Sequence, residues 1–282
     1  MTQLSTGTPL VTTDWVAENL ESGDFVLIEV DEDTDAYATG HISGSIAFNW
    51  RTDLQDPVKR DFIGPEAFAD LLDRSAITPE TTVVLYGGNN NWFAAYAYWY
   101  FRYYGHSDVR LMDGGRKKWE VEGRAFITDL PDVKSTTGYR TAGSDDSIRV
   151  LRDEVRAVVD AGSGTLVDVR SPEEYSGELL APAHLPQEAA QRGGHIPGAA
   201  NIPWSKSVNP ETGAFLPADE LRALYTGQGI TPDKEVVAYC RIGERSAHTW
   251  FVLHELLEFP DVRNYDGSWT EWGSLVGAPI ER

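Results

Sequence analysis

The chain has very few of the residues that build disulfides or metal sites. Only one of its 282 residues is a cysteine, Cys240, which excludes an internal disulfide and any metal site made of several cysteines. Its six histidines are scattered without the spacing of metal ligands, so neither a metal nor a cofactor is expected. Sparse cysteine is typical of a reducing compartment, and we expect a cytoplasmic protein.

Long apolar runs and basic residues are also scarce. No run of about 18 apolar residues is present, and the N-terminus lacks both a basic stretch and an apolar core, so we expect neither a membrane span nor a signal peptide. The net charge of −20 would repel the phosphates of a nucleic acid. Because salt limits that repulsion to about 8 Å, a local pair of arginines could still bind a small anion.

What the sequence does contain is an internal repeat. Short motifs recur in the same order at an offset of 153 or 154 residues, which indicates two homologous domains. The matched pairs are Gly40-His41-Ile42 with Gly194-His195-Ile196, Ile77-Thr78-Pro79 with Ile230-Thr231-Pro232, Tyr86 with Tyr239, Asp113-Gly114 with Asp266-Gly267, and Trp119 with Trp272.

The pattern of each copy predicts an α/β fold with a mainly parallel sheet flanked by helices. Short β-branched runs at 81–86, 165–169 and 235–239 alternate with helical stretches, including one expected over 246–258. We place the first domain at residues 1–125 and the second at 147–282. The segment 126–146, rich in Thr, Ser, Gly and Asp, is expected to be the linker.

Cys240 lies between the predicted strand 235–239 and the predicted helix 246–258, at the strand end where ligands bind in parallel sheets. Several backbone N–H groups converge at such a turn, and two arginines are nearby. We therefore expect this loop to stabilise the thiolate, with Ser246 capping the helix. The alternative is that a lone cysteine is an inert small apolar residue. The loop residues after Cys240 are Arg241, Ile242, Gly243, Glu244, Arg245 and Ser246.

The first copy lacks the residues that would make this loop reactive. Gly87 stands opposite Cys240, and Trp92 stands opposite Arg245, so the first domain is expected to be a scaffold. The helix that follows places Trp92, Tyr96, Trp99 and Tyr103 on one face, which is typical of a core or of an interdomain surface.

With these motifs the chain resembles the tandem-domain rhodaneses, a family of sulfurtransferases, over nearly its whole length. The resemblance rests on the loop Cys240–Arg245, the motif Gly194–Ala199 and the run Asp266–Trp272. Protein tyrosine phosphatases carry Cys-x5-Arg, whereas Arg245 gives Cys-x4-Arg here, a tighter cradle suited to a sulfur atom. The resemblance implies two rhodanese-like domains, of which the first is inactive.

The resemblance further implies ping-pong sulfur transfer through a persulfide on Cys240, with Arg245 as the second catalytic residue. Loop backbone N–H groups from Arg241 to Ser246 would hold the terminal sulfur, and Arg241 and Arg245 would bind the donor. Two loop arginines favour thiosulfate over 3-mercaptopyruvate as the donor. Glu244 weakens this preference unless its carboxylate faces outward.

The same comparison assigns three further expectations. Where thiosulfate enzymes of the family have a donor-binding arginine, this chain has Glu174, and Arg192 in the insert 176–193 is the candidate substitute. Asp168 is expected to pair with a loop arginine. The insert could cover the loop.

The expected partners are a small anionic sulfur donor and a thiophilic acceptor such as cyanide or a thiol. Three functions stay open: a thiosulfate sulfurtransferase, a 3-mercaptopyruvate sulfurtransferase, and a persulfide carrier that passes sulfur to a protein acceptor. A purely structural tandem is disfavoured by the intact loop.

Overall fold

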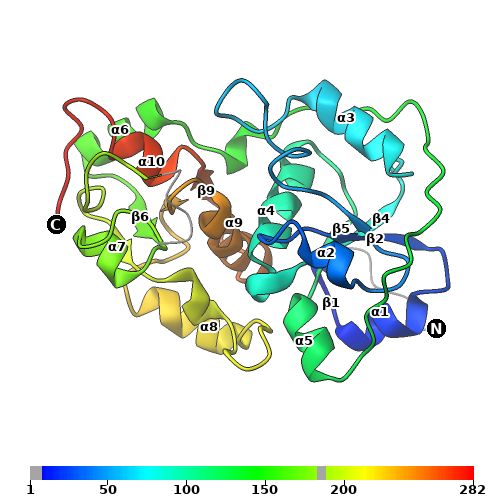
Figure 1. The fold of residues 1–282 in the computed structure, drawn as a ribbon. Coiled ribbons are helices and arrows are strands. Elements are labelled where there is room, and N and C mark those ends of the chain that lie inside the picture. Colours follow the sequence, from blue (N-terminus) through cyan, green and yellow to red (C-terminus); the bar gives the residue numbers. More distant parts are fainter. Residues whose placement is uncertain (1–7, 183–188) are drawn as a thin grey trace. The chain divides into compact units, whose positions relative to one another are not determined.

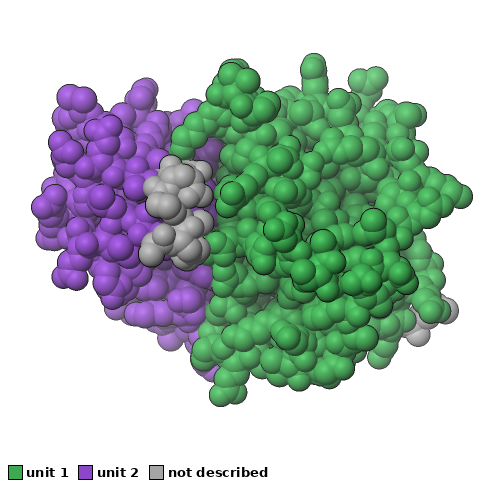
Figure 2. All heavy atoms as spheres, in the orientation of Figure 1, with its two compact units in different colours: residues 1–145, 208–215 green, residues 146–207, 216–282 purple. Residues whose placement is uncertain are grey.

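The computed structural model describes residues 8–182 and 189–282. Two compact units divide the chain (Figures 1 and 2). Unit 1 holds the residues up to Asp145 together with Val208–Phe215, and unit 2 holds Asp146–Ser207 and Leu216–Arg282. The segment 208–215, which the sequence assigned to the second domain, thus packs with unit 1.

Specific contacts hold this segment in unit 1. Val208 and Phe215 form an antiparallel bridge that closes it into a loop. The Phe215 N–H donates to the Asp113 carboxylate at 2.9 Å, and Lys117 Nζ donates to the carbonyl of Pro210. Contacts between residues about a hundred positions apart leave no periodic signal in the sequence.

The sheet of unit 1 has five parallel strands in the order β1-β5-β4-β2-β3 (Figure 1). The strands are β1 (Leu10–Val11), β2 (Phe25–Glu29), β3 (Ile46–Ala47), β4 (Thr82–Tyr86) and β5 (Val109–Met112). The helices are α1 (Thr13–Asn19), α2 (Ala36–Thr39), α3 (Pro65–Arg74), α4 (Gly88–Tyr103) and α5 (Gly115–Val121).

Unit 2 repeats this plan with four parallel strands in the order β7-β6-β8-β9. The strands are β6 (Thr165–Asp168), β7 (Ala200–Asn201), β8 (Val236–Tyr239) and β9 (Val262–Tyr265). The helices are α6 (Arg152–Ala161), α7 (Pro172–Ser176), α8 (Ala218–Thr226), α9 (Glu244–Trp250) and α10 (Ser268–Trp272), with 3-10 turns at Asp146–Ile148 and Trp204–Ser207. Two parallel α/β sheets confirm the predicted fold class.

Equivalent hydrogen bonds show that the two units are copies. The Tyr86 hydroxyl at the end of β4 accepts from the N–H of Ile42, and the Tyr239 hydroxyl at the end of β8 accepts from the N–H of Ile196. The repeated histidines stack on tyrosines, which is the structural role expected for them. The ring centroids of His195 and Tyr175 lie 3.6 Å apart. Buried β-branched residues make β8 a central strand, because both of its faces are covered.

The residues from 126 to 145, most of the predicted linker 126–146, form no helix or strand and belong to unit 1. The Asp73 carboxylate accepts hydrogen bonds from the N–H groups of Gly138 and Tyr139. The aromatic face of α4 is buried, and Phe62 packs against Trp99 at 5.6 Å within the same unit.

The helix expected over 246–258 begins two residues earlier, at Glu244, because Gly243 takes the left-handed conformation that starts it. Its last six residues, Phe251–Leu256, are π-helical. No helix among residues 8–182 and 189–282 is long and apolar enough to cross a bilayer.

Candidate active site

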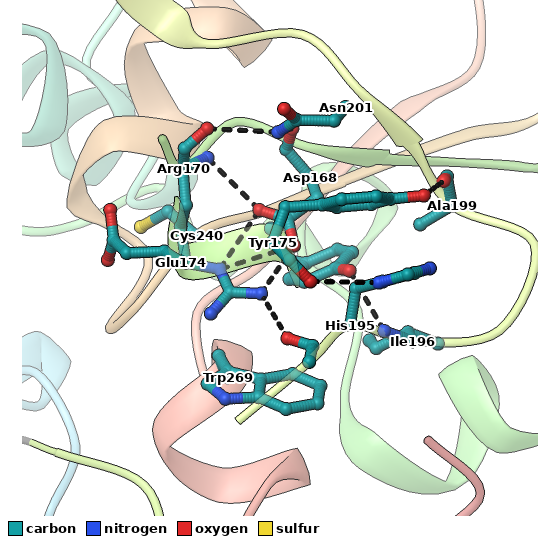
Figure 3. A network of polar contacts seen from close by, with 12 residues as sticks. Asp168, Arg170, Glu174, Tyr175, His195, Ile196, Ala199, Asn201, Cys240 and Trp269 are labelled. Carbon is teal, nitrogen blue, oxygen red and sulfur yellow. Dashed lines mark hydrogen bonds and ion pairs between the residues drawn. The ribbon is translucent and has the colours of Figure 1, made fainter. Parts of the chain in front are cut away.

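Cys240, which is labelled in Figure 3, comes directly after β8 and is fully buried. Its backbone N–H donates to Ser268 Oγ at 3.0 Å, and its carbonyl accepts from the N–H of Trp269 at 3.0 Å. Both partners belong to α10, at the end of the predicted Asp266–Trp272 motif. The strand end and α10 therefore fix the backbone on which the thiol is mounted.

The loop directs a backbone N–H at the thiol, as the sequence predicted. The Gly243 N–H donates to Cys240 Sγ at 3.2 Å, and Gly243 has a φ of +96° that brings the loop back over the sulfur. The N–H of Ile242 is used differently, because it donates to Glu244 Oε2 at 3.1 Å. Ser246 does not cap α9, because it lies within the first turn of that helix. Its Oγ donates to Asn264 Oδ1 at 2.6 Å.

Glu244 faces into the site rather than outward. It is completely buried, and its Oε2 accepts a hydrogen bond from Cys240 Sγ at 3.2 Å. Its other oxygen lies 3.4 Å from Arg241 Nη2. One carboxylate therefore joins the thiol to a loop arginine. Because Glu244 does not face outward, its negative charge offsets part of the positive charge of the loop arginines.

The expected stabilisation of the thiolate is wrong for this structure. Burial raises the pKa of Cys240, and the negative charge of Glu244 raises it further; Arg245 and the N–H of Ser246 lower it by less. The pKa of the thiol is therefore above its ordinary value. The two arginines and the loop N–H groups favour the thiolate, but the loss of water around the buried sulfur outweighs them.

Arg245 is held by Glu174 rather than left free for a donor. Its Nη1 and Nη2 donate to the two Glu174 oxygens at 2.7 and 3.0 Å, and both side chains are buried. Glu174 is fixed in turn on α7, where its N–H donates to Ser171 Oγ and its Oε2 accepts from the N–H of Ser171. The position noted as a departure from the family is thus part of the site.

Arg241 is buried, and most of its donors are unused. It is 2% exposed, and Nη2 lies near Glu244, but Nε and Nη1 have no hydrogen-bond partner among the described residues. Buried donors without partners are uncommon and costly in a folded protein. These two N–H groups are therefore candidates for binding the oxygen atoms of an anion.

Asp168 is paired, but with Arg170 instead of a loop arginine. Arg170 donates Nε and Nη2 to Asp168, the latter at 2.5 Å, and neither residue is exposed. Arg170 also donates to the carbonyl of Gly194 at 2.8 Å and lies over the ring of Trp269 (Figure 3). Arg170 thereby connects the end of β6 to the Gly-His motif. Asp168 pairs with Arg170, two residues away, and not with an arginine of the Cys240 loop.

Arg192 is not brought to the loop. Its side chain is exposed and donates to the carbonyl of Gln191 at 2.9 Å, and it lines a pocket with Gly273–Gly277 and Arg282. Part of the insert 176–193, residues 183–188, lies outside the described residues. The prediction that the insert covers the loop falls in part on these residues.

The charges around the thiol balance. Three arginines (Arg170, Arg241 and Arg245) face three carboxylates (Asp168, Glu174 and Glu244), all of them buried. Within the part of the chain that the structure describes, no cluster of three or more histidine, cysteine or carboxylate side chains is placed to hold a metal ion.

In unit 1 the equivalent loop is filled by the protein itself. The N–H of Gly88 donates to Asp31 Oδ2 at 2.6 Å, and the N–H of Gly87 donates to Asn91 Oδ1 at 3.0 Å. Asn89, Asn90 and Asn91 all have positive φ. Carboxylate and amide oxygens of the protein thus occupy the first two N–H groups of this loop.

The fold and the site define an α/β protein with a buried thiol at the carboxyl end of a central parallel strand, in a loop that directs the Gly243 N–H at the sulfur. The chain belongs to the rhodanese family: the model of the rhodanese-like domain matches it twice, over residues 12–122 and 151–275. Both units are therefore rhodanese domains, and the family supports sulfur transfer as the activity.

Curated relatives cover almost the whole chain. A protein of Mycolicibacterium smegmatis named "Putative thiosulfate sulfurtransferase" is 59% identical over 96% of this chain and 97% of its own. The "Sulfur carrier protein TtuD" of Thermus thermophilus is 57% identical over 97% of this chain and 96% of its own.

Solved structures of the same architecture are also similar. The anaerobic ergothioneine biosynthesis enzyme from Chlorobium limicola, in complex with trimethyl histidine, has a TM-score of 0.84 and 26% identity, and the match covers 100% of this chain and 72% of that one. A variant of EanB holding ergothioneine linked to a cysteine persulfide has a TM-score of 0.82 and 27% identity, covering 97% of this chain and 70% of that one.

Proposed function

We propose that this protein is a thiosulfate sulfurtransferase that moves the outer sulfur of thiosulfate to a thiophilic acceptor through a persulfide on Cys240. The observation that carries the proposal is the position of Cys240 Sγ, 3.2 Å from the N–H of Gly243 and within the influence of the Arg245 charge. An anion-binding loop around a nucleophilic sulfur is what sulfur transfer from an anionic donor requires.

In the first half-reaction the Cys240 thiolate attacks the outer sulfur of thiosulfate. A sulfur–sulfur bond forms on Cys240, and the bond to the sulfonate sulfur breaks. Sulfite leaves with the bonding pair. The persulfide anion that remains is stabilised by the N–H groups of Gly243 and Ser246, which already face the sulfur.

In the second half-reaction an acceptor such as cyanide or a thiolate attacks the terminal sulfur. The bond between the two sulfurs breaks, and Cys240 leaves as the thiolate, ready for another donor. Because donor and acceptor use the same atom in turn, the kinetics are ping-pong. A cysteine persulfide in the similar enzyme EanB supports this intermediate.

The three buried arginines have different roles in this proposal. Arg241 binds the sulfonate oxygens of the donor through its unpaired Nε and Nη1. Arg245 acts on Cys240 by its charge, because its Nη1 and Nη2 are bound to Glu174. Arg170 and Asp168 position the loop through Gly194 and Trp269.

The test is the intact mass of the protein after incubation with thiosulfate, with 3-mercaptopyruvate in parallel, each followed by cyanide. The expected result is a gain of one sulfur from thiosulfate that cyanide removes and that the Cys240→Ser variant never acquires. A gain from 3-mercaptopyruvate alone would replace thiosulfate by that donor. Undiminished transfer by the Cys240→Ser variant would overturn the mechanism.

A second candidate function is a persulfide carrier that passes sulfur to a protein acceptor. Two observations favour it: the relative named a sulfur carrier is 57% identical, and the balanced charges around the thiol offer no excess of positive charge to a dianion. A carrier would turn over slowly with cyanide and rapidly with a protein acceptor. Fast turnover with cyanide would favour the enzyme.

A further inference from the structure

One carboxylate contacts the reactive thiol directly. Glu244 Oε2 accepts the hydrogen bond of Cys240 Sγ at 3.2 Å, on the first turn of α9. Among the described residues no other side chain accepts a proton from this sulfur. Attack on a donor requires the thiolate, so the thiol must lose its proton. The carboxylate of Glu244 is the nearby group that can accept it.

We propose that Glu244 takes the proton of the Cys240 thiol as the donor is attacked and returns it when the persulfide is discharged. This role rests on the proposed sulfur transfer and adds a general acid–base residue to it. It assigns a function to a glutamate whose charge otherwise opposes a loop thought to bind anions.

The surroundings of Glu244 aim its carboxylate at the sulfur. Oε2 also accepts from the N–H of Ile242 at 3.1 Å, while Oε1 lies 3.4 Å from Arg241 Nη2 and 3.9 Å from Arg245 Nε. These contacts on both oxygens fix the rotamer. Glu244 is completely buried, so bulk water does not compete for the proton.

Other elements contribute charged groups that are already paired. From α7, Glu174 neutralises Arg245. On the turn before α10, Asp266 lies against Gly243 and is paired with Arg149 at 2.7 Å. Ser268 of α10 accepts from the backbone N–H of Cys240 and leaves the thiol to Glu244. No second acid or base in these contacts competes for the thiol proton.

The transfer also removes the charge that opposes the thiolate. Burial and the negative charge of Glu244 are the two main causes of the raised pKa of Cys240. When the proton moves from Sγ to Oε2, the thiolate forms at the moment that Glu244 becomes neutral. The total charge of the buried site does not change, so no uncompensated charge is created away from water.

The proton balance closes over the whole cycle. In the first half-reaction the S–H bond breaks, the proton goes to Glu244, and thiosulfate gives up its outer sulfur while sulfite leaves with the electron pair. In the second, the acceptor removes the terminal sulfur, and the released Cys240 thiolate takes the proton back from the carboxylic acid. No oxidant or reductant is needed.

The experiment compares two rates in the Glu244→Gln variant of the full chain. Gln keeps the size and an acceptor oxygen for Ile242 but cannot take a proton. The first rate is sulfur loading from thiosulfate, followed by quenched flow and intact mass from about pH 5 to about pH 9. The second is alkylation of Cys240 by iodoacetamide, which reports the thiolate and needs no donor.

The proposal predicts that the two rates move in opposite directions near pH 7. Loading falls about 100-fold, the usual size of a general-base contribution. Alkylation becomes faster, because removal of a buried negative charge lowers the pKa of the thiol. If loading rises together with alkylation, Glu244 acts only through its charge and the proposal is overturned.

Two further measurements keep the outcome decisive. If the Gln variant loses both rates, its loop is disrupted, and the Glu244→Asp variant is measured instead. A folded Asp variant that loads sulfur no faster than the Gln variant contradicts the proposal. If the unmodified protein gains no sulfur from thiosulfate, the proposed donor fails independently. Glutathione persulfide then replaces thiosulfate as the donor, and the same opposed changes are expected.

Discussion

Glu174 on α7 and Arg245 on α9 form a two-pronged ion pair, with N–O distances of 2.7 and 3.0 Å. They are 71 residues apart in the sequence, and the exposed fractions of their side chains are 1% and 5%. The pair therefore joins the element after β6 to the loop after β8, at the point where the thiol is held.

Removal of one partner of this pair should destabilise the protein strongly. We expect Glu174→Gln to lower the free energy of unfolding by about 3 kcal/mol, because it leaves the Arg245 charge buried without its counterion. Denaturant unfolding measures the change. The matched control is Asp160→Asn, which breaks the exposed Arg156–Asp160 pair and should cost no more than about 0.5 kcal/mol. Equal losses in both variants would contradict the buried pair.

The contribution of this pair should also depend on pH. Burial raises the pKa of Glu174, but the hydrogen bonds and charge of Arg245 outweigh it, and the pKa lies below its ordinary value of 4.5. A carboxyl with a lowered pKa stabilises the folded state above its unfolded pKa and loses that effect as the pH falls through its folded pKa.

The gap in unfolding free energy between the unmodified protein and Glu174→Gln should therefore be constant near neutral pH and shrink below pH 4.5. Denaturant titrations at several acidic pH values test this. A gap that stays unchanged down to about pH 2 would assign the stabilisation to packing rather than to charge.

Much of the architecture could be predicted because short sequence patterns encode it and because these patterns occur in both domains. Buried β-branched runs gave the central strands β4 and β8, and the repeat placed Cys240 at the end of one of them. Repetition also separated structural residues from reactive ones, since His41 occurs in a domain that has no thiol.

The partners of the arginines could not be predicted in the same way. Glu174 and Arg245 meet only because the tertiary fold brings a residue of α7 to a residue of α9, and no local pattern encodes that contact. The inward orientation of Glu244 is a rotamer choice made by its contacts with Ile242 and Arg241. The pair of Asp168 and Arg170 could be predicted from the sequence, because the two residues are only two positions apart.

The raised pKa of Cys240 predicts slow alkylation at neutral pH. Its causes are burial and the Glu244 carboxylate, so the thiol is mostly protonated where an exposed reactive cysteine would be ionised. We expect the rate with iodoacetamide to keep rising with pH through about 9. Because the chain has a single cysteine, intact mass gives this rate without ambiguity. A plateau near pH 7 would show a low pKa and contradict the structure.

Arg241 should control the affinity for an anionic donor. We expect Arg241→Met to lower kcat/KM for thiosulfate by about 10- to 100-fold, mostly through KM, because hydrogen bonds to a charged group are lost. Alkylation by uncharged iodoacetamide should change little. The control is Arg156→Met, whose arginine is exposed on α6 and should leave KM unchanged. An unchanged KM in Arg241→Met would leave Arg241 without a role in binding.

The loop over the sulfur should tolerate no side chain at Gly243. A Cβ there would lie 2.6 Å from the Cα of Asp266, a backbone atom that cannot move aside, and φ is +96°. The matched control is Gly229, which has a φ of +79° but nothing within 4 Å of an added Cβ. Both alanine variants carry the strain of positive φ, roughly 1–2 kcal/mol, and only Gly243→Ala adds a collision.

We therefore expect Gly229→Ala to be destabilised modestly and to keep its sulfur transfer. Gly243→Ala should lose more stability and most of its transfer, because relief of the collision moves the N–H that faces Cys240 Sγ. Thermal unfolding and sulfur loading measure the two effects. If Gly243→Ala loads sulfur as fast as Gly229→Ala, the position of that N–H does not matter for the persulfide, and the loop would have to stabilise the terminal sulfur by its charges alone.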